Sequence, residues 1–368
     1  MGALNPDPTF WAGKRVLLTG HTGFKGAWLS LWLARLGARV TGFALPPETR
    51  PNLFEAIAFP SEDSRIGDIR DLPALAAAVA AAEPEIVIHM AAQALVRPSY
   101  TDPVGTFAIN TMGSVHLLEA VRLAPSVRAV VVVTSDKAYE NREWPYAYRE
   151  TEAMGGRDPY SASKGCAELV TSAYRASFFG EDGHPARIAS ARAGNVIGGG
   201  DWSLDRLIPD IVRAFEAGAS VEIRAPHAIR PWQHVLEPLA GYLRLAECLA
   251  GADGAAFAEG WNLGPADEDC RPVSYLVERL AQGWGGGAGW HLSQKTHPHE
   301  ATYLKVDASK ARARLGWDRR LTLDTALDWT AAWYRAAASG ADPRALAEAE
   351  IARYEALGQP GAKAGVQA

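Results

Sequence analysis

The chain has few cysteines, no long apolar run and a slight deficit of charge, and each shortage excludes a class of protein. Three cysteines in 368 residues cannot build a disulfide scaffold. They lie far apart and form no C-x-x-C pair, which argues against a zinc site. No apolar segment approaches the roughly 20 residues that a membrane helix needs. We therefore expect a protein without structural disulfides or a membrane span.

Charge is sparse and almost balanced. Charged residues make up 21% of the chain and the formal net charge is −5, which disfavours a general nucleic-acid binder. The hydrophobic content of 48% is enough for a large core. The first 13 residues lack a basic segment followed by an apolar one, so the sequence predicts no secretory signal. We expect a cytoplasmic protein with its thiols in a reducing compartment.

Short apolar runs alternate with helix-like segments over the first half of the chain. The predicted strands are 15–19, 38–44, 86–89, 129–134 and 186–191, and the predicted helices are 25–37, 72–82, 106–123 and 160–179. Such alternation is typical of a parallel sheet covered by helices on both faces. The pattern predicts an α/β fold with a Rossmann-type doubly wound parallel sheet.

The pattern changes near residue 198, where glycine and proline become denser and loops longer. We expect a dinucleotide-binding domain over 10–197, to which later segments return, and a smaller C-terminal substrate lobe over 198–335. A helix over 342–357 and a loose tail would occupy most of 336–368.

A glycine-rich turn follows the first predicted strand. Residues 19–26 read TGHTGFKG, with Gly20, Gly23 and Gly26 in a G-x-x-G-x-x-G spacing. Glycines there allow a tight turn and close approach of the backbone to a pyrophosphate at a helix N-terminus. NAD sites often carry an acidic residue about 20 positions later. Residues 42–45 contain none, and Arg50 could face a 2'-phosphate or solvent, so this test leaves NAD and NADP open.

A second motif, Y-x-x-x-K, lies near the start of a predicted helix. Tyr160 and Lys164 share one helical face, so the ammonium group can approach the phenol. Together with a positive nicotinamide ring it could lower the pKa of the phenol from its usual value of about 10. Ser135 follows the strand 129–134, at the edge where parallel-sheet sites lie. It could hold a substrate hydroxyl whose proton Tyr160 removes.

With these motifs the chain resembles the extended short-chain dehydrogenases/reductases and, within them, the CDP-glucose 4,6-dehydratase family. The resemblance spans about residues 10–335 and rests on TGHTGFKG, HMAAQ (89–93), TSDKAYEN (134–141), RAGNVIG (192–198), RPWQHVLE (230–237), WNLG (261–264) and the segment 307–317. It implies an NAD-dependent hydro-lyase of deoxysugar biosynthesis, which converts CDP-glucose to CDP-4-keto-6-deoxyglucose and water. Family members oxidise sugar carbon 4 transiently, eliminate water across carbons 5 and 6, and return the hydride to carbon 6.

The resemblance also implies the residues of the site. NAD contacts are expected from Gly20, Thr22, Gly23, Phe24, Gly26, Asp68, Ile69, Ala91, Tyr160 and Lys164. Substrate contacts are expected from Gln93, Asn195, Arg206 and Arg230, the last at the diphosphate. Beside Ser135, Tyr160 and Lys164, the catalytic set includes Asp136 as acid and Lys137 as base. Lys137 could instead stay charged and stabilise the enolate.

Several alternatives stay open at this point. Another NAD-dependent nucleotide-sugar dehydratase or an epimerase would share Ser135, Tyr160 and Lys164, and preference for cytosine follows from the resemblance alone. A non-catalytic dinucleotide sensor and a reductase that releases NADP are less favoured. No metal is expected, although His297, His299 and Glu300 could mimic a ligand set. Helices 106–123 and 160–179 would form a homodimer or a dimer of dimers, or would pack only within the monomer.

Overall fold

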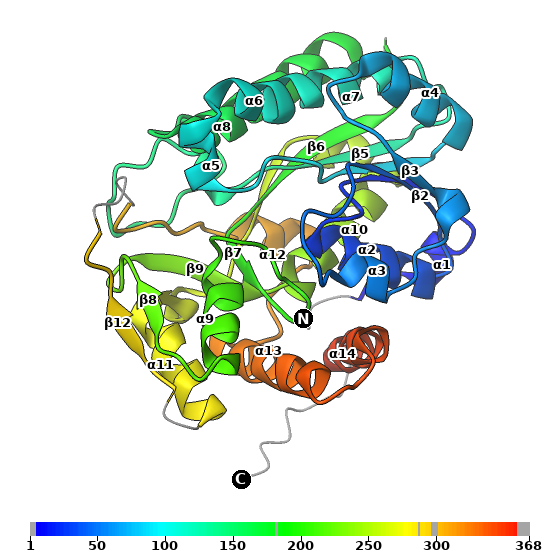
Figure 1. Cartoon of the computed structure of the whole chain (residues 1–368). Helices are drawn as coiled ribbons and strands as arrows, with labels where there is room; N and C mark the ends of the chain where they lie inside the picture. The colour runs from blue at the N-terminus through cyan, green and yellow to red at the C-terminus, as the bar shows by residue number, and fades with distance from the viewer. Residues whose placement is uncertain (1–4, 181–182, 286–287, 296–300, 359–368) are drawn as a thin grey trace.

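Seven parallel strands form the central sheet of the computed structural model, which describes residues 5–180, 183–285, 288–295 and 301–358 (Figure 1). Their spatial order is β10-β6-β5-β4-β1-β2-β3. The strands are β1 (Arg15–Thr19), β2 (Arg39–Ala44), β3 (Ser64–Ile66), β4 (Ile86–His89), β5 (Ala129–Val133), β6 (Arg187–Ala193) and β10 (Gly260–Leu263). The chain runs outward from β1 to β3 and then returns to β4 on the other side of β1. The predicted doubly wound sheet is confirmed, and its switch point lies between β1 and β4.

Helices cover both faces of this sheet. One face carries α4 (Leu72–Ala82), α6 (Pro103–Phe107), α7 (Gly113–Arg122) and α8 (Pro159–Phe178), and the other carries α2 (Phe24–Arg35) and α10 (Leu236–Ala250) (Figure 1). Side chains of β1 alternate between the two layers: Val16 and Leu18 join the core under α2 and α10, whereas Leu17 joins the core under α4 and α7. Burial on both faces explains why these strands are continuous apolar runs.

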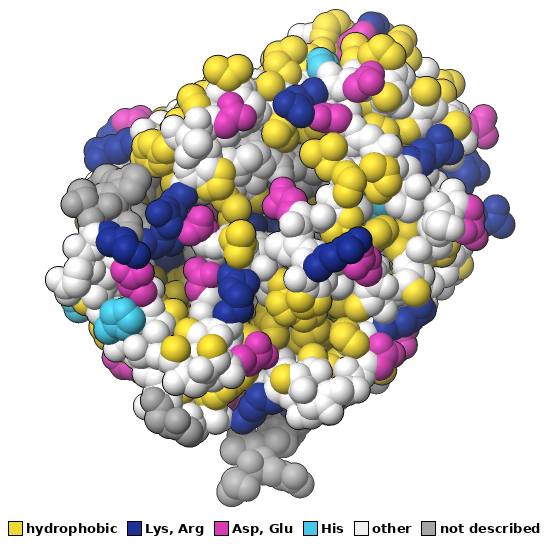
Figure 2. Space-filling view, in the orientation of Figure 1, with side chains coloured by type: hydrophobic (Ala, Val, Ile, Leu, Met, Phe, Trp, Pro, Cys, Tyr) yellow, Lys and Arg dark blue, Asp and Glu magenta, His cyan; other side chains and the backbone are white. Residues whose placement is uncertain are grey.

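The outer surface mixes charges of both signs. On the face seen in Figure 2, Lys and Arg side chains stand among Asp and Glu rather than in a block of one sign. No helix in the described ranges is both long and apolar enough to cross a bilayer.

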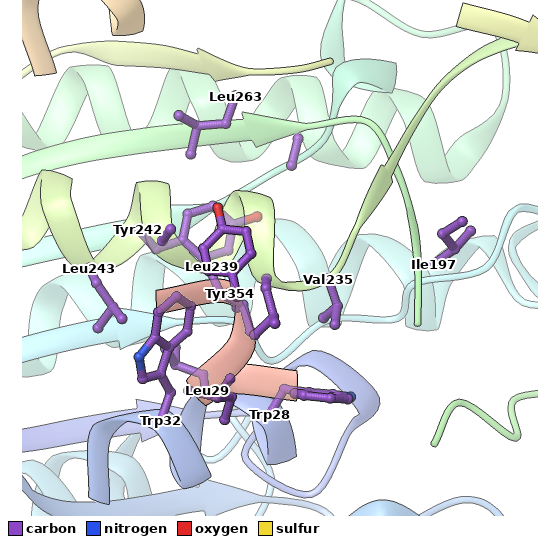
Figure 3. Close-up of a cluster of buried hydrophobic side chains, with 14 of the residues drawn as sticks. Trp28, Leu29, Trp32, Ile197, Val235, Leu239, Tyr242, Leu243, Leu263 and Tyr354 are labelled. Atoms are coloured by element: carbon purple, nitrogen blue, oxygen red, sulfur yellow. The ribbon is translucent and has the colours of Figure 1, made fainter. Parts of the chain in front are cut away.

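The core between α2, α10 and the C-terminal helix α14 (Pro343–Leu357) is rich in large side chains (Figure 3). Leu29 and Trp32 of α2 meet Leu239 and Leu243 of α10, and Tyr354 of α14 stacks edge-on against Trp32 with ring centroids 5.7 Å apart. Fully burying each such side chain contributes roughly 1.5–3 kcal/mol. α14 is therefore part of the folded body; the tail from residue 359 lies outside the described residues.

The helix expected over 106–123 is made of three segments. α6 and α7 are joined by η2 (Ala108–Met112), which has π-helical hydrogen bonding. Asn110 in this turn is buried; its amide donates to the Gln93 carbonyl (3.0 Å) and to Ser163 Oγ on α8 (2.9 Å). The wider turn thus ties the loop after β4 to α8, in keeping with the common use of π-bulges near functional sites.

The later part of the chain forms two small sheets beside the main one. β11 (Cys270–Pro272), β9 (Ile229–His234) and β7 (Asn195–Ile197) make the first, and β12 (Trp290–Leu292) and β8 (Val221–Ile223) the second. α9 (Leu207–Glu216), α11 (Val273–Trp284), α12 (Ser309–Leu315) and α13 (Leu323–Ala338) accompany them. α10 and β10 leave this part and pack on the main sheet, and the boundary expected at residue 335 falls inside α13.

Short helices complete the fold: α1 (Pro8–Trp11), α3 (Leu53–Ala56), α5 (Val96–Thr101), η1 (Ser61–Asp63), η3 (Asp136–Ala138), η4 (Gly254–Phe257) and η5 (Asp267–Asp269).

Candidate active site

A cavity of about 640 Å³ opens at the carboxyl ends of the central strands. Residues of the dinucleotide-binding part and of the later part of the chain both line this cavity. Of the residues expected in the site, it gathers Ser135, Asp136, Lys137, Tyr160, Lys164, Asn195, Arg206 and Arg230. Four segments far apart in the sequence, after β5, on α8, after β6 and around β9, therefore meet at one place.

The glycine turn between β1 and α2 is shaped for a dinucleotide. Gly20 has φ +77°, and a Cβ on it would lie 2.7 Å from the Ala91 nitrogen. A Cβ on Gly26 would lie 2.0 Å from the Gly20 carbonyl oxygen, so only glycine lets α2 pack on the turn. Gly23 is exposed and caps the N-terminus of α2. This cradle fits the pyrophosphate of NAD or NADP, because free N–H groups and the helix dipole favour an anion there.

The other cofactor residues expected from the sequence surround this turn with different roles. The Thr22 hydroxyl donates to the Leu45 carbonyl (2.8 Å), and the Ala91 nitrogen donates to Thr19 Oγ1 (3.2 Å). Phe24 is half-buried in the first turn of α2. Ile69 is buried under α7, so only its backbone can reach a cofactor. The Asp68 carboxylate accepts a fork of hydrogen bonds from Arg70, which lowers the pKa of Asp68.

The end of β2 explains why no carboxylate follows the glycine motif at the usual distance. The His21 ring is buried there and fills the space beside Gly42. A Cβ added to Gly42 would lie 2.3 Å from the ring. His21 Nε2 is 2.8 Å from Ser64 Oγ, and burial lowers the pKa of His21 to about 4, so the ring is neutral at pH 7. Arg50 is 3.7 Å from Glu55, in an exposed ion pair.

Tyr160 and Lys164 lie on one face of α8, as predicted. Asp158 caps this helix by accepting from the Ser161 nitrogen (2.9 Å), and Pro159 occupies its first position, so Tyr160 stands in the first turn. Both functional side chains are buried, and Lys164 Nζ donates to the Val133 carbonyl at the end of β5 (3.4 Å).

The phenol of Tyr160 is a weak acid within the protein framework. Burial raises the pKa of Tyr160 to about 12, although the Ser135 hydroxyl and the charge of Arg206 act to lower it. Burial also lowers the pKa of Lys164 to about 8. The protein groups by themselves thus leave the pKa of the phenol above its usual value, and a bound, positively charged nicotinamide would act to lower it.

Asp136 is a buried carboxyl beside this pair. It is 2% exposed; Oδ1 accepts from Ser135 Oγ (2.9 Å), and Oδ2 has no hydrogen-bond partner among the described residues. Burial raises the pKa of Asp136, and the opposing charges of Lys137 and Arg230 do not overcome that effect. Lys137 Nζ lies 5.9 Å from the centroid of the Tyr160 ring. A buried carboxyl with a raised pKa and a lysine therefore stand next to the tyrosine.

The residues expected to contact substrate divide into two groups. Asn195, Arg206 and Arg230 line the cavity, and Arg206 Nη1 is 3.8 Å from Asp201. Gln93 is not among the lining residues. Its side chain donates to Thr106 Oγ1 (3.1 Å) and accepts from the Leu95 nitrogen (2.5 Å), so it shapes the loop after β4 instead.

Two features of the site were absent from the predicted set. Lys25, inside the glycine motif, lines the cavity, and burial together with Arg206 and Lys164 lowers its pKa to about 7. Glu168 stands one helical turn after Lys164 and forms a buried ion pair with Arg192 (2.7 Å). The spacing of 160, 164 and 168 was visible in the sequence, but the partner of Glu168 was not.

His89 was expected to end a strand rather than to catalyse, and it is the last residue of β4. It is buried at the end of β4, with Nδ1 2.7 Å from Thr19 Oγ1. The described residues contain no cluster of three or more His, Cys, Asp or Glu suited to a metal. His297, His299 and Glu300 lie outside those residues.

Comparison with known proteins identifies the family. The model of the NAD dependent epimerase/dehydratase family matches residues 16–258, and the chain belongs to that family. Within it, the chain is 54% identical to CDP-glucose 4,6-dehydratase of Salmonella typhimurium, over 95% of this chain and 98% of that protein. dTDP-glucose 4,6-dehydratase of Mycolicibacterium smegmatis is 28% identical, over 94% of this chain and all of that protein.

Solved structures share the fold. An epimerase from Methanothermobacter thermautotrophicus superposes with a TM-score of 0.78 at 22% identity, over 90% of this chain and 95% of that chain. A dTDP-glucose 4,6-dehydratase from Streptomyces venezuelae, crystallised with NAD, gives 0.70 at 24% identity, over 90% and 99%. At these identities the likeness concerns the architecture.

Proposed function

We propose that this chain is an NAD-dependent hydro-lyase that converts CDP-glucose to CDP-4-keto-6-deoxyglucose and water. The observation that carries the proposal is the buried carboxyl of Asp136, whose pKa is raised by burial, beside Lys137 in the cavity that holds Tyr160. A sugar oxidation at carbon 4 needs only Ser135, Tyr160 and Lys164, whereas loss of water needs a further acid and base. The 54% identity to a CDP-glucose 4,6-dehydratase supports the same activity and the choice of cytidine.

The glycine cradle would hold the cofactor through Gly20, Gly23 and Gly26, with the backbone of Ala91 beside it. When bound, NAD supplies a two-electron acceptor that oxidises sugar carbon 4 and is restored later in the cycle. Three basic side chains in the cavity, Lys25, Arg206 and Arg230, would hold the diphosphates of cofactor and substrate.

Tyr160 is the base for the first step. Ser135 would hold the carbon-4 hydroxyl by a hydrogen bond, and the phenolate of Tyr160 would accept its proton. The charge of Lys164 favours that phenolate. Because the resulting ketone acidifies carbon 5, the next proton to leave is the one on that carbon.

Asp136 and Lys137 act in the elimination. Asp136 would donate a proton to the leaving carbon-6 hydroxyl, a task that its raised pKa suits, since the acid must be protonated near pH 7. Lys137 would take the carbon-5 proton when neutral, or stabilise the enolate when charged. Lys137 Nζ lies 5.9 Å from the centroid of the Tyr160 ring, which supports the two residues acting on one sugar ring.

An end-point assay tests this proposal. Purified chain with catalytic NAD is offered CDP-, dTDP-, GDP- or UDP-glucose, and 4-keto-6-deoxy products are followed by their absorbance in alkali. Product from CDP-glucose alone, absent with Tyr160→Phe, is the expected result. Product from another donor would transfer the specificity to that base, and carbon-4 epimers without a deoxy product would make the chain an epimerase.

We also propose a homodimer formed by the helices that carry the site. Large apolar side chains stand exposed on this layer, among them Val104 on α6 (78% exposed), Met112 on η2, and Leu169 (61%) and Phe178 on α8. Figure 2 shows hydrophobic side chains along the upper edge of the molecule, where these helices lie. An apolar surface of this kind on a water-facing helix layer suits a second copy. A cytoplasmic location, supported by three free thiols, completes the proposal.

A further inference from the structure

Glu168 extends the motif of Tyr160 and Lys164 by one more helical turn. The three residues follow one another at four-residue spacing along α8, so they share a face. Glu168 is 5% exposed, and its carboxylate is surrounded by donors rather than water. A buried charge of this kind is costly unless it is fully paired.

The carboxylate of Glu168 joins three elements. Oε1 accepts a hydrogen bond from Thr134 Oγ1, directly before Ser135. Oε2 accepts from Ser190 Oγ (2.6 Å) and from Arg192 Nη2 (2.7 Å), both on β6. Burial acts to raise the pKa of Glu168, but the charge and hydrogen bonds of Arg192, with those of Ser190 and Thr134, hold it below its usual value. Glu168 is therefore ionised.

Arg192 is itself held in one position. Its Nη1 donates to Tyr139 Oη (2.7 Å) and to the Glu150 carbonyl (3.3 Å), and its guanidinium lies 5.1 Å from the Tyr139 ring centroid. Tyr139 Oη donates in turn to Asn262 Oδ1 on β10 (2.7 Å). The negative charge of Glu168 is thus fixed in place by a network reaching the far edge of the sheet.

The charge of Glu168 acts on Lys164 together with several other charged or titratable groups nearby. On its own helix the facing groups are Tyr160 and Glu168; Lys25 on α2 and His89 on β4 are close enough for Lys164 to lower their pKa values. Burial lowers the pKa of Lys164, and Glu168 acts to raise it. Further away, Asp136 after β5 acts on Lys25, and Arg192 on β6 pairs with Glu168.

We propose that Glu168 is a positioning residue for the proposed reaction. Held by Arg192, its carboxylate keeps Lys164 in the charged form and, through Thr134, fixes the end of β5 that presents Ser135 and Asp136. Lys164 must be charged to favour the phenolate of Tyr160, so the pair Glu168–Arg192 supports the first proton transfer without touching the sugar. The catalytic purpose of this role rests on the proposed function, whereas the predicted charge state of Lys164 does not.

The test measures Lys164 directly in the substrate-free protein. The chain has eight lysines, so lysine labelled with ¹³C at Cε gives a small set of signals, and Lys164→Arg assigns the one in question. Glu168→Gln removes the charge and keeps the shape. Its expected effect is a fall of about one pH unit or more in the Lys164 titration midpoint. An unchanged midpoint in folded Glu168→Gln overturns the proposal.

Two further variants separate charge from packing. Ser190→Ala removes one hydrogen bond to the same carboxylate and keeps the charge, so the Lys164 midpoint is expected to stay in place. Glu168→Gln/Arg192→Met avoids leaving a buried guanidinium without its partner, in case the single variant does not fold. It is expected to lower the midpoint as the single variant does, and an unchanged midpoint here overturns the proposal too.

Turnover gives the second measurement. If the midpoint falls from about 8 by one unit, the charged fraction of Lys164 drops about eightfold at about pH 8.5 and by less than half at about pH 6.5. Glu168→Gln should therefore lose kcat mainly at alkaline pH. An equal loss at both pH values would indicate a purely structural role and contradict the proposal. Absence of deoxy product from the parent chain would instead count against the proposed function, because the lysine titration does not depend on it.

Discussion

Asp136→Asn removes the proposed acid while leaving its surroundings in place. Asparagine has nearly the same shape, and its carbonyl can still accept from Ser135 Oγ, now 2.9 Å from Asp136 Oδ1. What is lost is the ionisable carboxyl proton, which burial favours by raising the pKa of Asp136. General acid catalysis is worth about 10²–10⁴-fold in rate, or about 2.7–5.4 kcal/mol of activation free energy. We expect formation of the 6-deoxy product to slow by that factor.

The assay shows which reaction step is impaired in Asp136→Asn as well as how large the loss of rate is. In D₂O, exchange of the carbon-5 hydrogen is expected to persist in Asp136→Asn, because Tyr160 and Lys137 are untouched. In the parent chain, turnover should decline as pH rises through the raised pKa of Asp136, since a carboxylate cannot donate, and this decline should vanish in the variant. Asp210→Asn is the matched control: burial raises the pKa of Asp210 too, but it pairs with Arg213 outside the cavity. Product formation within about tenfold of the parent would refute the role of Asp136.

Four further predictions concern single side chains. Tyr160→Phe should keep the circular dichroism spectrum but lose about 10²–10⁴ in kcat, and a smaller loss would assign the base elsewhere. Gly26→Ala should force α2 off its turn, costing about 1–3 kcal/mol in urea unfolding and weakening NAD binding in a fluorescence titration; unchanged NAD affinity would contradict the cradle. Leu169→Glu should halve the mass in sedimentation, Leu357→Glu on α14 should not, and an intact dimer in both would place the interface elsewhere. Burial lowers the pKa of His89 to about 3, so below about pH 6.5 the unfolded chain binds a proton at this residue that the folded chain does not. The free energy of unfolding therefore decreases by up to about 1.4 kcal/mol for each unit by which the pH is lowered. His89→Gln should flatten this slope between pH 6 and 5.

The central sheet could be predicted because its strands are buried on both faces. Runs such as 15–19 and 129–134 are apolar without alternation, and each is followed by a helix-length segment, so sequence order alone defines the crossovers. β10 could not be assigned in this way. It is four residues long and comes between β9 and β11 in the chain, yet it pairs with β6 of the main sheet, where Asn262 accepts a hydrogen bond from Tyr139.

Within the site, the predicted geometry agrees with the structure where it depends on local spacing. Tyr160 and Lys164 are four residues apart on one helix, and the glycines bracket a single turn. It was incomplete where partners are distant in sequence. Glu168 meets Thr134 and Arg192 only after β5 and β6 pair, and the amide of Gln93 turns to Thr106 because the π-helical turn brings that helix close.

The same burial has opposite consequences for the two acids of the cavity. Exclusion of water raises the pKa of Asp136 and of Tyr160 alike, which suits a proton donor but not a proton acceptor. The cations of the cavity cannot correct both, since positive charge that lowers one pKa also acts on the other. Lys137 and Arg230 act to lower the pKa of Asp136 without overcoming burial, so its pKa remains raised. The phenolate of Tyr160 would be favoured for the first proton transfer by Lys164 and by the positive charge that oxidised NAD would supply when bound. Asp136, whose raised pKa favours its protonated form, would be suited to donate the proton in the elimination.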